Sequence, residues 1–117
     1  MTTMEIARRL VELGREGRPQ DAVRELYAEN IVSIEPPSSP SPRTEGLKAV
    51  LERGQRFDEM IEVVHSGSIS DPIIKGNFFS VGWSIDITMK DQQRLVLDEI
   101  CLYKTENGKI VEVQFFY

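Results

Sequence analysis

Two glutamates in this sequence lie among apolar residues, where a carboxyl group can act as an acid or a base. The first, Glu35, stands between Ile34 and Pro36. Partial burial there would raise the pKa of the carboxyl group towards neutrality, because an apolar environment disfavours the charged form. A carboxylate of that kind can take a proton from a carbon next to a carbonyl group. Glu35 is therefore a candidate catalytic base, and a solvated loop carboxylate is the alternative interpretation.

The second glutamate, Glu99, belongs to an alternating apolar segment that ends at Tyr103. If Leu97 and Cys101 face inward in a strand, Glu99 faces inward with them. A carboxylic acid in an apolar cavity can stay protonated and donate a hydrogen bond to an oxyanion. A register shift of one residue would turn Asp98 inward instead. Both phases stay open, and the alternation favours Glu99.

The only histidine, His65, is a third catalytic candidate, because imidazole exchanges a proton near neutral pH. A purely structural histidine in a sheet is the alternative interpretation. Side chains of the C-terminal half share faces of the predicted strands and would form the core and the pocket wall. Trp83 and Tyr103 suit a ligand best, because each joins an apolar body to a hydrogen-bond donor. The predicted pocket residues are Trp83, Ile85, Tyr103, Val113, Phe115 and Tyr117.

The composition argues against several other kinds of site. A net charge of −5 gives no attraction to nucleic acid or to an anionic membrane surface. The single cysteine, Cys101, and the single histidine lack the paired spacing of a zinc site, so no metal and no cofactor is expected. Cys101 lies in an apolar run and is predicted to be a small buried side chain. Without a cleavable leader or a disulfide framework, the predicted location is cytoplasmic.

The first part of the chain is predicted to be mainly helical, and its helices must position these residues. Apolar residues at helical spacing predict a first helix, which Thr2 or Thr3 can cap. Pro19 suits the first turn of a second helix, which is predicted to include Tyr27. A stretch rich in serine and proline has too little apolar content to pack and is predicted to be an exposed loop. The predicted segments are helices at 4–15, 19–30 and from about 44 to 60, a strand at 31–35 and the loop at 36–43.

The remaining residues change to the period-two alternation of strands, which is clearest from Phe79 to Met89. Asn107 and Gly108 predict a tight hairpin. Helices followed by long antiparallel strands indicate one α+β domain over residues 1–117. Long twisted strands curl, and a curled sheet closed by helices encloses an internal pocket. The predicted strands are 61–70, 78–89, 94–104 and 109–117.

In this order, several short motifs resemble the SnoaL-like branch of the nuclear-transport-factor-2-like superfamily, which includes ketosteroid isomerases. The segment 26–32 followed by Ile34-Glu35-Pro36 is similar to the family's exit from its second helix. The segment 45–50 resembles the start of its third helix. Asp98-Glu99-Ile100 and the segment 107–117 resemble its last two strands. The match extends over nearly the whole chain.

This resemblance implies a cone-shaped α+β fold, with three helices on a strongly curved antiparallel sheet, and a homodimer through the outer sheet face. It places Glu35 where the steroid isomerases carry a catalytic aspartate, and Glu99 near an acidic residue of the family. The isomerases also use a tyrosine on the first helix, which residues 4–15 lack. The implied function is a cofactor-free isomerase, cyclase or dehydratase acting on an apolar carbonyl compound. A non-catalytic module that binds an apolar ligand, or a dimeric interaction module, is the alternative.

Overall fold

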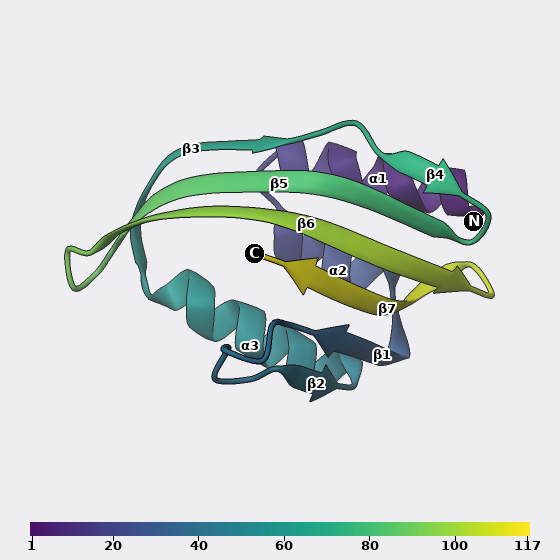
Figure 1. Ribbon diagram of the computed structural model, residues 1–117, viewed down its shortest axis with the longest axis horizontal. Helices are drawn as coiled ribbons and strands as arrows, with labels where there is room; N and C mark the ends of the chain where they lie inside the picture. The colour runs from purple at the N-terminus through teal and green to yellow at the C-terminus, as the bar shows by residue number, and fades with distance from the viewer.

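The computed structural model describes all residues from 1 to 117. Three helices lie on one side of a seven-stranded sheet, and the long strands β5 and β6 bend across them (Figure 1). The predicted α+β architecture with a curved sheet is confirmed. The helices are α1 (Thr3–Arg15), α2 (Pro19–Leu26) and α3 (Leu47–Glu59), and the strands are β1 (Tyr27–Ile34), β2 (Arg43–Glu45), β3 (Ile61–Ile69), β4 (Ile73–Lys75), β5 (Phe78–Met89), β6 (Arg94–Glu106) and β7 (Lys109–Phe116).

Helix α1 begins with a capping box between Thr2 and Glu5. The Thr2 hydroxyl accepts a hydrogen bond from the Glu5 backbone N–H, and the Glu5 carboxylate accepts one from the Thr2 N–H. Both otherwise unpaired donors are thereby satisfied. The apolar stripe of α1 then packs into the core, where Ile6 and Ala7 are fully buried. No helix of the structure is long and apolar enough to cross a bilayer.

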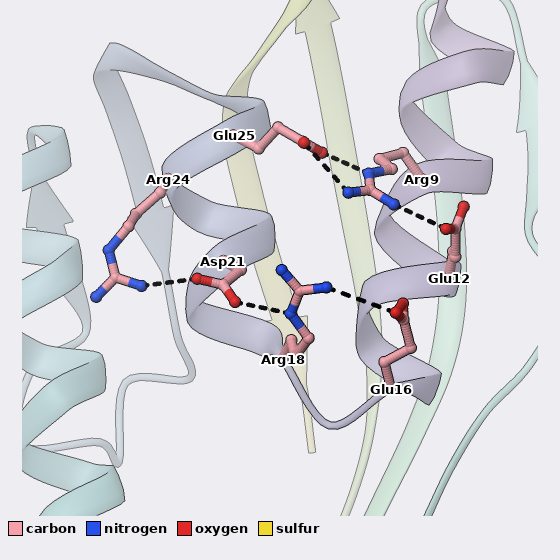
Figure 2. A network of polar contacts seen from close by, with 7 residues as sticks. All are labelled: Arg9, Glu12, Glu16, Arg18, Asp21, Arg24 and Glu25. Atoms are coloured by element: carbon pink, nitrogen blue, oxygen red, sulfur yellow. Dashed lines mark hydrogen bonds and ion pairs between the residues drawn. The ribbon is translucent and has the colours of Figure 1, made fainter.

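Ion pairs join the exposed sides of α1 and α2 (Figure 2). The Arg9 guanidinium of α1 lies 2.6 Å from the Glu25 carboxylate of α2. At the start of α2, Arg18 lies 2.9 Å from Asp21. Hydrogen bonds from these arginines hold the pKa values of Glu25 and Asp21 below their usual range. Each exposed pair is individually weak, so the pairs supplement the apolar packing between the helices. The network is completed by Glu12, Glu16 and Arg24.

The sheet is mixed rather than purely antiparallel. Its strand order is β2-β1-β7-β6-β5-β3, with β4 paired to β5, and β1 runs parallel to β7. This parallel pairing joins the first strand to the last and places the end of β1 beside the C-terminus of the chain. The sheet therefore brings residues 33–35 close to residues 113–117, which are far away in sequence.

The core fills the space between the helices and the concave face of the sheet. Phe79 of β5 stacks on Tyr103 of β6 with ring centroids 4.6 Å apart, and both are almost fully buried. Val113 of β7 is also fully buried. Tyr103 and Val113, predicted as pocket residues, therefore belong to the packed core in this structure.

Three features of the chain differ from the predicted segments. Helix α2 ends at Leu26, so Tyr27 begins β1 instead of lying on the helix. The predicted loop ends in strand β2, which pairs with β1 so that Glu45 lies opposite Val32. The short strand β4 was not predicted and pairs with the start of β5. Strands of three residues are too short to show an alternation, and their pairing depends on partners far away in sequence.

Candidate active site

Glu35 lies at the point where β1 leaves the sheet. Ile31, Ser33 and Glu35 alternate inward along the strand, and the first two are fully buried. Glu35 itself is half-buried. Its backbone N–H donates to the Pro42 carbonyl at 2.8 Å, and its carboxylate accepts a hydrogen bond from the Ser39 hydroxyl at 2.9 Å. The loop after β1 therefore folds back and holds the Glu35 carboxylate at the rim of the sheet.

Glu99 lies on the concave face of β6, opposite Trp83 of β5. The Cys101 thiol donates a long hydrogen bond of 3.8 Å to the Glu99 carboxylate. Asp98 points the other way, is exposed, and accepts a hydrogen bond from the Ser84 hydroxyl. The structure thus has the strand phase that the alternation favours, with Glu99 inward. Its role in catalysis stays a prediction.

The two glutamates share one electrostatic environment. Burial raises the pKa of the Glu99 carboxyl group, and the negative charge of Glu35 raises it further. The Cys101 hydrogen bond and the positive charge of Arg53 oppose this shift in the Glu99 pKa. The raised pKa favours the protonated form of Glu99, which is the form that can donate a hydrogen bond.

Three more ionisable side chains are buried more deeply than Glu99. Burial is the main cause that raises the pKa values of Cys101, Tyr103 and Tyr27 far above their usual ranges. All three side chains therefore stay neutral at ordinary pH. Cys101 has no exposed surface, in agreement with the interpretation of this residue as a small buried side chain.

A groove of about 380 Å³ opens beside Glu35 where the ends of β1 and β7 meet. Phe115 is half-buried in its wall, whereas Tyr117 at the end of the chain is 61% exposed. Burial and then the charge of Glu35 raise the pKa of the Tyr117 hydroxyl. Glu99 is not among the lining residues, so the predicted internal pocket that joins both glutamates stays a prediction. The groove is lined by Ile34, Glu35, Pro36, Pro37, Gln114, Phe115, Phe116 and Tyr117.

Trp83 and Ile85 are half-buried on the concave face of β5. The Trp83 indole lies against α1 so closely that a Cβ atom at Gly14 would be 3.0 Å from the ring. The absence of a side chain at Gly14 therefore leaves room for the indole. Trp83 is in register with Glu99, and the two side chains are neighbours on the same face.

His65 lies apart from these residues. It is exposed on the edge strand β3, and its ring Nε2 is 2.6 Å from the Thr88 hydroxyl. The hydrogen bond from Arg94 is the main cause that lowers the pKa of Asp86, which alternates with the inward-facing residues of β5 and faces outward like Thr88. The charge of Glu35 thus acts on Glu99, whereas the third catalytic candidate lies on the outward-facing side with Thr88.

Two residues near Glu35 and Glu99 were not predicted from the sequence. Ser39 belongs to the loop that was predicted to be exposed, and its hydroxyl binds Glu35. Arg53 of α3 is half-buried and affects the pKa values of Glu99, Tyr117 and Tyr27. The helical pattern alone does not distinguish Arg53 from the neighbouring charged residues of α3, because its contacts come from β1 and β2.

Comparisons with known proteins agree with this architecture. A crystal structure from Mesorhizobium loti, described provisionally as a SnoaL-like polyketide cyclase, is 35% identical, with a TM-score of 0.93 over 100% of both chains. An NTF2-like protein from Burkholderia thailandensis is 13% identical, with a TM-score of 0.82 over 99% of this chain and 90% of that one. A protein from Bacillus subtilis, described provisionally as an isomerase, is 20% identical, with a TM-score of 0.73 over 98% and 88%.

No curated protein matches the chain. The family model of the SnoaL-like domain matches residues 1–117, the whole of the sequence. Together with the shared fold of the M. loti protein, this match shows that the chain belongs to the SnoaL-like domain family.

Proposed function

We propose that this protein binds a small apolar carbonyl compound on the concave side of the sheet and moves a proton on it, with Glu35 as base and Glu99 as acid. The observation that carries the proposal is the raised pKa of Glu99, caused by burial and by the charge of Glu35. The charge of Glu35 thus acts on a residue 64 positions away in the sequence. A raised pKa caused by burial and by a second carboxylate is typical of the acid in an acid and base pair.

The proposed step needs only these two side chains. The ionised Glu35 carboxylate takes a proton from the carbon next to the carbonyl group, so a C–H bond breaks and an O–H bond forms. The electron pair moves onto the carbonyl oxygen, where protonated Glu99 donates a hydrogen bond to the developing oxyanion. If the enolate is conjugated with a second double bond, return of the proton from Glu35 to the far carbon gives an isomerisation. If the enolate carbon instead forms a C–C bond with a second carbonyl group of the ligand, that carbonyl oxygen becomes an alkoxide, takes the proton from Glu35, and a cyclisation results. No cofactor takes part in either outcome.

The apolar walls support an apolar ligand. Trp83 is the neighbour of Glu99, and Phe115 lines the groove next to Glu35. Both are half-buried, so a ligand ring placed against them would remove further apolar surface from water. The provisional descriptions of relatives as a cyclase and as an isomerase are in line with proton transfer on a carbonyl compound.

Hydrogen exchange into a model ketone tests the proposed proton transfer. We expect the wild-type protein to catalyse exchange of the C1 hydrogens of 2-tetralone in D₂O, measured by proton NMR. Glu35→Gln should slow catalysed exchange by roughly 100-fold or more, because the base is lost. Glu99→Gln should slow it less, because an amide still donates a hydrogen bond. Asp98→Asn is the matched control and should exchange at the wild-type rate, since Asp98 faces outward.

The result that contradicts the proposal is equal exchange in the wild-type and Glu35→Gln proteins. Binding of 2-tetralone without any catalysed exchange would instead support the alternative of a non-catalytic ligand-binding module. Binding is measured separately by the fluorescence of Trp83, the single tryptophan of the chain.

We also propose that the protein is a homodimer in the cytoplasm. The outer face of the sheet carries three exposed apolar side chains, Val96, Ile100 and Phe116, and the last two are direct cross-strand neighbours. Contiguous exposed apolar surface is typical of an interface. The single free thiol of Cys101 is compatible with a reducing compartment.

A further inference from the structure

Arg53 projects from α3 towards β2 and towards β1, which leads to Glu35. Its guanidinium donates one hydrogen bond of 2.9 Å to the Thr44 hydroxyl and another of 2.9 Å to the Ser33 hydroxyl. It forms no ion pair with any carboxylate of the chain. Ser33 is fully buried and Arg53 is half-buried. The structure therefore holds a positive charge in place with neutral hydroxyls alone.

This arrangement leaves both the charge and several donors of Arg53 unused. A guanidinium has five N–H donors in a rigid plane, and the two hydroxyls accept only two of them. Hydroxyl acceptors do not neutralise the charge as a carboxylate would. Withdrawing a charge from water without a counter-ion costs free energy, so an arginine held this way is ready for an anionic partner.

The positive charge of Arg53 acts at the candidate site. Burial raises the pKa values of Glu99 on β6 and of Tyr117 at the end of the chain, and the charge of Arg53 opposes both shifts. Ser33, whose hydroxyl accepts a hydrogen bond from Arg53, is two residues before Glu35 on the same inward-facing row. Arg53 is therefore anchored to the strand that leads to the proposed base.

We propose that Arg53 binds a negatively charged oxygen of the ligand. The ligand is then an apolar ring compound that carries an oxyanion. The inference rests on the proposed function, in which removal of a proton by Glu35 leaves an enolate. Glu99 donates a hydrogen bond to that oxygen, and Arg53 supplies the positive charge. Two sources share this chemistry: an enolate that forms in the reaction, and a carboxylate that the ligand carries.

Binding of three naphthalene probes tests the proposal. The probes are 2-naphthoate, which carries a permanent carboxylate, 2-naphthol, which can ionise like an enol, and neutral 2-naphthalenemethanol. We expect Arg53→Met to weaken binding of an anionic probe by roughly 10-fold to 100-fold, the range of a hydrogen bond to a charged group, and to leave the neutral probe unchanged. Loss for naphthoate alone identifies a carboxylate ligand, and loss for naphthol alone identifies an enolate.

Three control variants separate binding from folding. Arg56→Met removes an exposed arginine one turn further along α3 and should bind like the wild type. Arg53→Lys keeps the charge and should retain part of the affinity for the anionic probes. If Arg53→Met fails to fold, Arg53→Lys replaces it in the test. Its affinity should then fall for 2-naphthoate and 2-naphthol and stay unchanged for the neutral probe. Thr44→Val removes one anchor of the guanidinium but not its charge, and should retain most of the affinity.

Two outcomes would overturn the role of Arg53. One is unchanged affinity of Arg53→Met for both 2-naphthoate and 2-naphthol, and the other is an equal loss for all three probes, which indicates a structural role. The Glu35→Gln variant separates this inference from the proposed function. It removes the base but keeps Arg53, so it should bind the anionic probes at least as tightly as the wild type while it fails to catalyse exchange.

Discussion

Glu99 is a carboxylic acid with a tryptophan as its direct neighbour across the sheet. Its pKa is raised in the folded protein, and an unfolded glutamate titrates near its ordinary value. The folded state thus binds the Glu99 proton more tightly than the unfolded state. Linkage then requires that the contribution of Glu99 to stability falls as the pH rises from the unfolded pKa through the folded pKa.

Replacement of Glu99 by glutamine should therefore stabilise the protein in a pH-dependent way. Below the unfolded pKa of a glutamate the two proteins should differ least. As the pH rises through the folded pKa of Glu99, the free energy of unfolding of the variant should exceed that of the wild type by a growing amount. Urea unfolding at a series of pH values measures this. Glu35→Gln should reduce the pH dependence, because the charge of Glu35 contributes to the raised pKa; a constant difference at all pH values would contradict the account.

Individual residues could be predicted from the sequence where a local pattern determines their orientation. Alternation was enough to favour Glu99 over Asp98, because a strand turns successive side chains to opposite faces. Arg53 and Ser39 could not be found in this way. Their contacts with Thr44, Ser33 and Glu35 arise only when distant segments meet.

At the scale of elements, predictions succeeded where the signal is contained in one segment. Helix α1 was predicted because Thr2 and Glu5 form its cap and an apolar stripe follows. The end of α2 was misplaced, because Tyr27 continues the helical spacing of apolar residues yet its backbone is extended. Its pairing with Ile110 of β7 decides the matter, and this contact is 83 residues away in sequence. Tertiary pairing thus overrode a local pattern.

Elements also determine where the proposed base lies. The loop predicted at 36–43 is largely exposed, as its composition indicates, and it is also tied to Glu35 by a backbone and a side-chain hydrogen bond. Strand β2, which follows the loop, pairs with β1 and presents Thr44 to Arg53. The short strand β2 therefore connects the loop, the proposed base and helix α3.

At the scale of the whole molecule, the parallel pairing of β1 with β7 distinguishes the fold from the predicted antiparallel arrangement. A hairpin pattern cannot show such a pairing, because the two strands are separated by almost the entire chain. The curvature followed from strand length, since β5 and β6 have 12 and 13 residues and long twisted strands bend. The outer face that this bending exposes is the proposed dimer interface.

The proposed homodimer predicts a clear effect of one charged substitution. Ile100 is 57% exposed and pairs with Phe116 on the outer face. Ile100→Asp would bury a charge in the interface, so sedimentation should show a monomer where the wild type is a dimer. Met4→Asp, at an exposed position on α1, is the control and should remain a dimer. A monomeric wild-type protein, or a dimer that persists in Ile100→Asp, would rule out this interface.

The central claim is that burial and the charge of Glu35 raise the pKa of Glu99. Carbon-13 NMR of the glutamate side-chain carboxyl groups, recorded against pH in the wild type and in Glu35→Gln, measures this directly. We predict that Glu99 titrates above the ordinary glutamate range in the wild type, and that its pKa moves downward when the charge of Glu35 is removed. An ordinary pKa for Glu99, or one that is the same in both proteins, would contradict the account.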